Sequence, residues 1–287
     1  MDYFLGIDAG GSHCRARLVD ETGRVLGTGK AGPANARIGM DLLHTTLSDA
    51  AGQAVAGAGL GPEAVATVRA GMGIAGITRP GVREQLAALP FPFASVAYET
   101  DAVIANIGAH GGADGAILIL GTGSIAQVRV GARNFSIGGY GFPISDEGSG
   151  AALGLSAMRH ALRALDGRTR VTPLSVAVAE RFGHDTAQAI AWMDGASPRD
   201  YATFAPLVMD HAERDDEIAR SIVEDAALHI ERFIEAIFAS GAPACALVGG
   251  LSARMRPWLR ARTVARLSEA RGDALDGALL LAGYRPA

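Results

Sequence analysis

The sequence contains the same strand-rich pattern twice, and this repeat constrains the fold more than any other feature. Three strand-like runs, separated by short turns that contain glycine, come first. They lie at residues 3–8, 13–20 and 25–30. A shift of 112 positions superposes Gly11-Ser12 on Gly123-Ser124, again between two strand-like runs, but it places Asp8 on Leu120. We therefore expect two related units, each built on an antiparallel three-stranded meander, with a shared shape and different chemistry.

The segments that follow each meander predict an α/β protein of two lobes. Residues 40–58 have apolar side chains at helical spacing, and strand-like and helix-like segments then alternate. Strands are expected near 65–71, 95–99 and 245–250, and helices near 80–89, 147–165, 174–182, 198–212, 218–240 and 275–284, with one more beginning at Asp101. Because 287 residues exceed one typical domain, we expect one lobe from 1–112 with 274–287 and a second from 113–273.

Composition excludes several classes of function. Lys and Arg total 26 against 30 Asp and Glu, so a net charge of -4 offers no broad cationic surface to nucleic acid or to an anionic membrane. Cys14 and Cys245 have no neighbouring Cys or His ligand, and the seven His residues show no metal-binding spacing. We find no secretory signal pattern and no apolar run of membrane-spanning length. We expect a cytoplasmic protein that acts on a small molecule.

The two glycine turns are the first candidates for a binding site. In the first, a strand ends in the carboxylate of Asp8, and small residues follow it. Backbone N–H groups in such a turn can surround phosphate oxygens, and an Asp at the end of a strand can hold Mg²⁺ through water. The same arrangement also occurs in ordinary hairpins. Its recurrence at residues 121–124 favours a triphosphate ligand, because one turn can face each end of the triphosphate.

Five segments, taken in order, carry a resemblance to a known family, and a sixth also looks like a segment of it. They are LeuGlyIleAspAlaGlyGlySer at 5, GlyProAlaAsn at 32, GluThrAspAla at 99, LeuGlyThrGlySer at 120, GlyGlyTyrGlyPheProIleSerAspGluGlySer at 138 and CysAlaLeuValGlyGlyLeu at 245. The chain resembles the sugar kinase, actin and heat-shock chaperone superfamily, in which two ribonuclease H-like lobes close over ATP. The closer resemblance is to the N-acetylglucosamine kinase and BadF/BadG/BcrA/BcrD-type ATPase family. It implies the actin-like ATPase fold, with an active-site cleft between the lobes.

The resemblance implies roles for individual residues. It makes Asp8 the acid associated with Mg²⁺ and Asp101 the catalytic base that receives the proton of the sugar hydroxyl. Phosphate contacts fall to Gly10, Gly11, Ser12, Gly121, Thr122, Gly123 and Ser124, and adenosine contacts to Gly249 and Gly250. Sugar contacts fall to Asn35, Asp101, Gly138, Gly139 and Asp146. This division suits phosphoryl transfer, which needs positioning, charge neutralisation and one carboxylate that orients and deprotonates the attacking hydroxyl.

Each polar candidate also has a purely structural interpretation. Asp101 opens an expected helix, where Asp is a common N-cap residue. Asp146 and Glu147 precede another expected helix, where acids in the first turn complement the helix dipole. Asn35 follows GlyProAla and could be a turn residue, although its amide can also donate to and accept from sugar hydroxyls.

The resemblance implies an ATP-dependent hexosamine kinase. The expected reaction is phosphorylation of N-acetylglucosamine at its 6-hydroxyl, with glucosamine as the alternative, because Arg37 stands where an aromatic residue could have packed on the acetyl group. Rivals of other classes are a BadF-type activator ATPase, a non-catalytic sugar sensor and a chaperone-like ATPase. The expected cofactors are ATP and Mg²⁺. A small amino sugar is the expected partner, and a homodimer is compatible with the resemblance.

Overall fold

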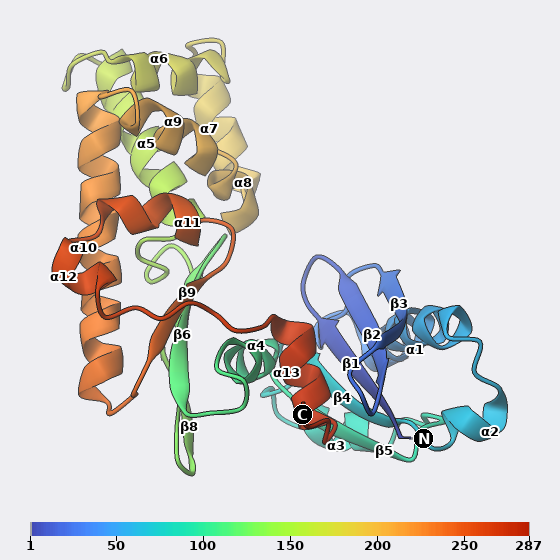
Figure 1. Ribbon diagram of the computed structural model, residues 1–287. Coiled ribbons are helices and arrows are strands. Elements are labelled where there is room, and N and C mark those ends of the chain that lie inside the picture. Colours follow the sequence, from blue (N-terminus) through green and yellow to red (C-terminus); the bar gives the residue numbers. More distant parts are fainter. Residues whose placement is uncertain (1, 287) are drawn as a thin grey trace. The chain divides into compact units, whose positions relative to one another are not determined.

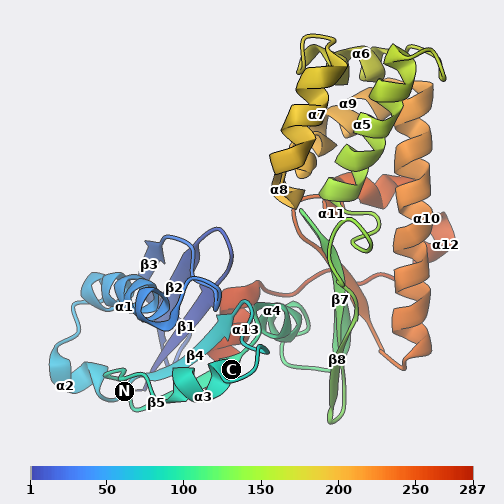
Figure 2. The ribbon, with the colours of Figure 1, turned by 180° about the vertical axis from the view of Figure 1, so that it is seen from behind.

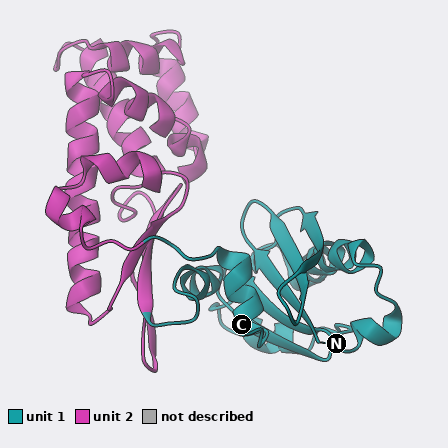
Figure 3. Ribbon diagram, in the orientation of Figure 1, with its two compact units in different colours: residues 1–114, 269–287 teal, residues 115–268 magenta. Residues whose placement is uncertain are grey.

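The structure is a computed structural model, and it describes residues 2–286 (Figure 1 and Figure 2). The chain divides into two compact units, which Figure 3 shows in different colours. Unit 1 comprises Met1–Asp114 and Glu269–Ala287, and unit 2 comprises Gly115–Ser268. Unit 2 is therefore one continuous stretch of chain, whereas unit 1 is assembled from two stretches.

Unit 1 is built on a five-stranded sheet of order β3-β2-β1-β4-β5. The strands are β1 (Tyr3–Ala9), β2 (Cys14–Asp20), β3 (Val25–Ala31), β4 (Arg69–Ile74) and β5 (Ser95–Glu99). The first three form the expected antiparallel meander, and β4 and β5 continue the sheet parallel to β1. The helices are α1 (Met40–Gly57), α2 (Pro62–Val65), α3 (Val82–Ala87), α4 (Asp101–Ala109) and α13 (Ala274–Leu281).

The alternation of side chains along β1 sets the two faces of this sheet. Leu5 and Ile7 are fully buried in the core that contains Leu43 and Leu47 of α1. Phe4 points to the opposite face and packs with Leu279 of α13. Successive side chains of a strand point to opposite faces, so one strand serves both layers of helices.

Helices α4 and α13 approach each other closely because glycines lie at their contact. A Cβ added at Gly277 of α13 would lie 1.7 Å from the carbonyl oxygen of Ile104 in α4. A Cβ added at Gly108 of α4 would lie 1.9 Å from the carbonyl oxygen of Asp273, the N-cap of α13. Only glycine permits backbones to pack at this distance. The position of α4, which begins with Asp101, therefore depends on α13.

Unit 2 repeats the pattern with a four-stranded sheet of order β8-β7-β6-β9. Its strands are β6 (Gly115–Leu120), β7 (Ser124–Val130), β8 (Arg133–Gly138) and β9 (Cys245–Val248). A second antiparallel meander again continues with a parallel strand next to its first strand, as in unit 1. The repeat predicted from the sequence is therefore present in the strand order and not only in the glycine turns.

Helices supply most of the remaining mass of unit 2. They are α5 (Gly150–Leu165), α6 (Pro173–Glu180), α7 (Thr186–Gly195), α8 (Pro198–Ala202), α9 (Ala205–Ala212), α10 (Glu217–Ala239), α11 (Ser252–Met255), the 3₁₀ helix η1 (Arg256–Trp258) and α12 (Ala261–Val264). The long helix α10 packs against strands β6, β7, β8 and β9 as well as α5 and α9, and Figure 2 shows it along one side of the unit. The fold class expected from the sequence, α/β with two sheets, is confirmed.

Some expected elements differ in the structure. Pro62 opens the short helix α2, so the strand expected from residue 65 begins only at Arg69. Both cysteines are buried, and burial raises the pKa of each thiol to about 12, which makes them apolar core residues rather than reactive groups. Within residues 2–286, no helix combines the length and apolar character that a membrane span requires.

Candidate active site

The carboxyl ends of the parallel strands gather the polar candidates of unit 1. Asp8 lies near the end of β1, and Asp101 follows β5 by two residues. Asn35 forms an isolated parallel bridge with Ala75, which directly follows β4. In open α/β sheets, ligands bind outside these ends of the strands. The structure therefore places Asp8, Asn35 and Asp101 along one edge of a single sheet.

Asp8 is paired with an arginine that the sequence interpretation did not include. Arg15 lies opposite Asp8 in the register of β1 and β2, and its Nη2 donates to Asp8 Oδ2 at 2.6 Å. The turn between them is closed by a hydrogen bond from Gly10 N to His13 O, and a Cβ added at Gly11 would meet no atom within 4 Å. Gly11 and Ser12 are exposed, so this turn is open to a ligand.

Asp101 is not the N-cap of its helix. Thr100 has that role, because its hydroxyl accepts a hydrogen bond from the backbone N–H of Val103 at 3.0 Å. Asp101 is the first helical residue and accepts from Ala102 N at 2.9 Å. Burial raises the pKa of Asp101 above its ordinary value, and the negative charge of Asp8 raises it further. The capping interpretation is therefore wrong for Asp101, and its carboxylate has the perturbed pKa that is common at functional sites.

Asn35 forms the hydrogen bonds of a turn residue, and it is half-exposed. The backbone N–H of Arg37 donates to Asn35 Oδ1 at 2.9 Å, and Ile38 N donates to Asn35 O at 3.2 Å. The Arg37 side chain is exposed. Residues 73–78, GlyIleAlaGlyIleThr, adjoin Asn35 through its bridge to Ala75 and were missed in the sequence. The glycines of this segment, which lies at the end of the strand next to β1, were the sequence signal that could have identified it.

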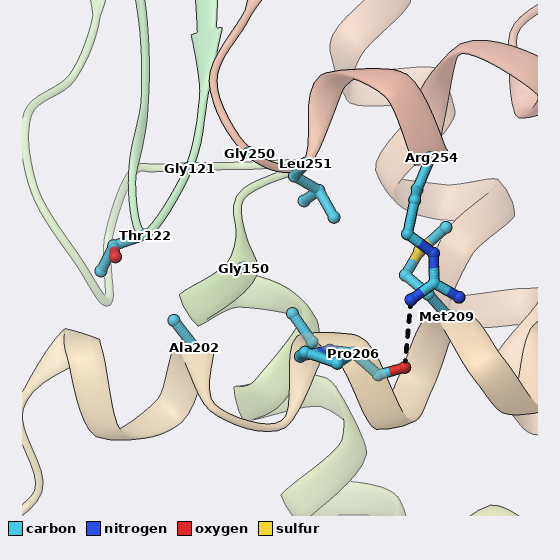
Figure 4. A pocket seen from close by; sticks show the side chains of 10 residues that line it. Gly121, Thr122, Gly150, Ala202, Pro206, Met209, Gly250, Leu251 and Arg254 are labelled. Atoms are coloured by element: carbon cyan, nitrogen blue, oxygen red, sulfur yellow. Dashed lines mark hydrogen bonds between the residues drawn. The ribbon is translucent and has the colours of Figure 1, made fainter.

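Unit 2 contains a cavity of about 280 Å³ with one polar and one apolar part. Gly121, Thr122 and Gly250 contribute backbone and a hydroxyl, whereas Ala202, Ala205, Pro206, Met209 and Leu251 contribute apolar surface. Figure 4 shows the carbonyl of Pro206 facing Arg254, which donates to it at 3.5 Å. Arg254 also forms ion pairs with Asp210 and Glu213. A largely apolar pocket with a few polar groups is typical of small-molecule sites.

The two glycines that follow β9 contribute in different ways. Gly250 lines the cavity directly, whereas Gly249 has a φ of 98° and a Cβ there would lie 2.4 Å from Leu120 O. Gly249 therefore allows the end of β9 to approach β6, which leads into the 121–124 turn. Sequence reasoning found both glycines but missed the apolar wall formed by α8, α9 and Leu251, because apolar helical residues facing a cavity have no distinctive pattern.

The 121–124 turn and residues 138–147 are joined within unit 2. Ser124 is buried, and its hydroxyl donates to Glu147 O at 2.8 Å. Gly138 and Gly139 have φ values of 69° and 72°, and Cβ atoms there would clash with core side chains of β7 and α10. Asp146 precedes α5, which begins at Gly150 with Ser149 as N-cap, so Asp146 lies outside the first turn and the helix-dipole interpretation is wrong for it.

The structure thus forms two separate groups of candidates. Unit 1 holds Asp8, the 10–12 turn, Asn35 and Asp101, and unit 2 holds the 121–124 turn, residues 138–146 and the end of β9. The cleft that was expected between the lobes stays a prediction. Within residues 2–286, no three His, Cys, Asp or Glu side chains form a metal-binding cluster.

Comparison with known proteins finds several similar proteins, and their descriptions agree with one another. A glucosamine kinase from Vibrio cholerae is 37% identical over 283 residues, covering 99% of this chain and 96% of that protein. An N-acetyl-D-glucosamine kinase from Dictyostelium discoideum is 27% identical over 243 residues, covering 79% of this chain and 76% of that protein. The crystal structure of a putative N-acetylglucosamine kinase from Chromobacterium violaceum superposes with a TM-score of 0.88 at 32% identity, covering 98% of this chain and 99% of that one. The model of the BadF/BadG/BcrA/BcrD ATPase family matches residues 5–282, and the chain belongs to this family.

Proposed function

We propose that the protein transfers the terminal phosphoryl group of ATP to the 6-hydroxyl of an amino sugar. The observation that carries this proposal is Asp101, a half-buried carboxylate of raised pKa at the same sheet edge as Asp8 and Asn35. A base of this kind can accept the proton of a sugar hydroxyl as the hydroxyl attacks phosphorus. Glucosamine is the first candidate, because the relative with 37% identity over nearly the full chain is a glucosamine kinase.

N-acetylglucosamine is the second candidate, and it was the one favoured by the sequence. The solved structure with a TM-score of 0.88 is described as a putative N-acetylglucosamine kinase, which keeps this substrate in consideration. The two sugars differ at the 2-position, where glucosamine has a free ammonium group and N-acetylglucosamine has an acetamido group. A carboxylate favours the first, and an apolar wall with one amide partner favours the second.

The residues of unit 1 fit a Mg²⁺ ion that arrives with the nucleotide. Mg²⁺ is commonly held by one or two carboxylates together with phosphate oxygens and water, and Asp8 offers one carboxylate beside the open 10–12 turn. When bound there, Mg²⁺ would neutralise charge on the phosphates. In unit 2, we assign the apolar part of the cavity to adenine and the 121–124 turn to phosphate oxygens. A cytoplasmic location and a homodimer remain predictions.

The test is a panel of sugars with ATP and Mg²⁺, followed by identification of the phosphorylated position by NMR. We expect ADP release to require glucosamine or N-acetylglucosamine and the product to carry phosphate at the 6-position. A preference of tenfold or more for either sugar decides the substituent at the 2-position. ATP hydrolysis at the same rate without any sugar would instead support an activator ATPase, and ATP binding without turnover would support a sensor.

Asp8→Asn should weaken the binding of Mg²⁺ and lower the rate. The amide keeps the volume of the side chain but loses the negative charge that holds the ion, so about tenfold more Mg²⁺ should be needed for half-maximal activity. A magnesium titration of turnover measures this. Asp2→Asn is the matched control, because Asp2 is also paired with an arginine of the same sheet but is exposed. An unchanged magnesium requirement in Asp8→Asn would remove Asp8 from this role.

Ala202→Leu should weaken nucleotide binding by about tenfold or more, because the larger side chain occupies the apolar part of the unit 2 cavity. Calorimetric titration with ADP measures the change, and the KM for the sugar should stay the same. Ala187→Leu, at an exposed position of α7, is the control for the added surface. If ADP binds equally well to both variants, adenine does not occupy this cavity.

A further inference from the structure

Asp146 has an unusual backbone conformation next to the 121–124 turn. Its φ is 67°, in the left-handed region that residues other than glycine adopt only where surrounding contacts stabilise it. Burial raises the pKa of its carboxyl above the ordinary value, and the nearby backbone groups of Ser124 and Phe142 favour the charged form. A Cβ added at Gly123 would lie 2.8 Å from Asp146 Oδ2. The carboxylate therefore lies directly against the turn.

The residues that follow Asp146 hold the same turn at further points. The backbone N–H groups of Gly150 and Ala151 donate to the first two carbonyl oxygens of the turn at 2.8 and 3.0 Å. The Ser124 hydroxyl donates to Glu147 O. The first two residues of the turn line the cavity assigned above to ATP. The contacts from residues 146–151 thus determine where the N–H groups of the turn lie in that cavity.

We propose that Asp146 is a positioning residue for the nucleotide, with a carboxylate that holds the 121–124 turn in the geometry that receives phosphate oxygens. The proposal rests on the assignment of the unit 2 cavity to ATP. It differs from the sugar-contacting role that the family resemblance implies for this residue. It also connects the segment that carries Gly138 and Gly139 with the turn that binds phosphate.

The chemistry of the side chain explains why an aspartate suits this position. An ionised carboxylate only accepts hydrogen bonds, so both of its oxygens can face the nearby backbone N–H groups of Ser124 and Phe142. An asparagine in the same place has one oxygen, and its NH₂ group would face a second N–H donor. Asp146→Asn should therefore release one end of the turn while keeping the volume of the side chain.

Asp146→Asn should weaken the binding of ADP and of a non-hydrolysable ATP analogue by about ten- to a hundredfold, measured by calorimetry without sugar. Asp146→Gly should show a similar loss, because glycine accepts the positive φ but has no carboxylate. Asp194→Asn is the control, since Asp194 is an exposed aspartate of α7 in the same unit. In both Asp146 variants, hydrogen exchange should become faster at the amides of Ser124 and Phe142 but not along β6.

Two results would overturn the positioning role. One is unchanged nucleotide affinity in both Asp146 variants, whatever happens to the affinity for the sugar. The other is unchanged hydrogen exchange at Ser124 and Phe142. If the unaltered protein itself fails to bind nucleotide, the proposed kinase function is overturned instead, so the two failures are distinguishable.

Discussion

Asp101→Asn is expected to lower turnover by about two to four orders of magnitude and to leave nucleotide affinity nearly unchanged. The amide has almost the same volume as the carboxylate but cannot accept the proton of the sugar hydroxyl. Because Thr100 caps α4, the substitution should also leave the start of the helix intact. Steady-state kinetics and calorimetry with ADP measure the two effects separately.

The pH profile gives an independent check on Asp101. Its pKa is raised, chiefly by burial, so protonation inactivates the base at a higher pH than for an ordinary Asp of pKa 3.8. The rate of the unaltered protein should therefore fall as the pH drops through this raised pKa, and the residual rate of Asp101→Asn should lack that fall. Asp41→Asn, an exposed first-turn aspartate of α1, serves as control. Near-normal turnover in Asp101→Asn would mean that another group is the base.

Gly277→Ala is expected to destabilise unit 1 by about 3 kcal/mol or more. The new Cβ would lie 1.7 Å from Ile104 O, and neither atom belongs to a flexible side chain that could move aside. The helices α4 and α13 must therefore separate, which also displaces Asp101. Chemical denaturation, followed by fluorescence and circular dichroism, measures the loss of stability.

Gly52→Ala is the matched control and should have the opposite sign. Gly52 also lies inside a helix, α1, but a Cβ there would meet no atom within 4 Å. Alanine should then stabilise the protein by about 0.5–1 kcal/mol, because it costs less conformational entropy in a helix than glycine does. Equal effects of the two substitutions would contradict a tight contact between α4 and α13.

Patterns with a regular period were predictable from the sequence. The two meanders follow from alternating strands and glycine turns, and α10, expected at 218–240, spans Glu217–Ala239. Segments without a clear period were not predictable. The helix α7 was missed, and α5 was expected from residue 147 although Ser149 caps it at Gly150. Residues before a cap can be polar and helix-like in composition without belonging to the helix.

The residues of the candidate site were also only partly predictable from the sequence. A carboxylate next to a glycine turn can be recognised in a sequence, and Asp8 was found in this way, whereas the role of Asp101 came from the family resemblance. Pairing partners across strands depend on register, so Arg15 became visible only in the structure, opposite Asp8. The close approach of Asp146 to Gly123 joins residues that are 23 positions apart in sequence and depends on a left-handed backbone, which no local pattern specifies.

The origin of α13 has a consequence for the order of events during synthesis. The strands β1 to β5 and the helix α4 leave the ribosome first, but α13 emerges only after the whole of unit 2 has been made. Until then, Phe4 and Val19 lack the apolar partners that cover them in the folded protein. Unit 2, being continuous, can complete its own core earlier. The nascent chain therefore carries an unfinished first unit throughout the translation of the second, and this is the interval in which it most needs protection from aggregation.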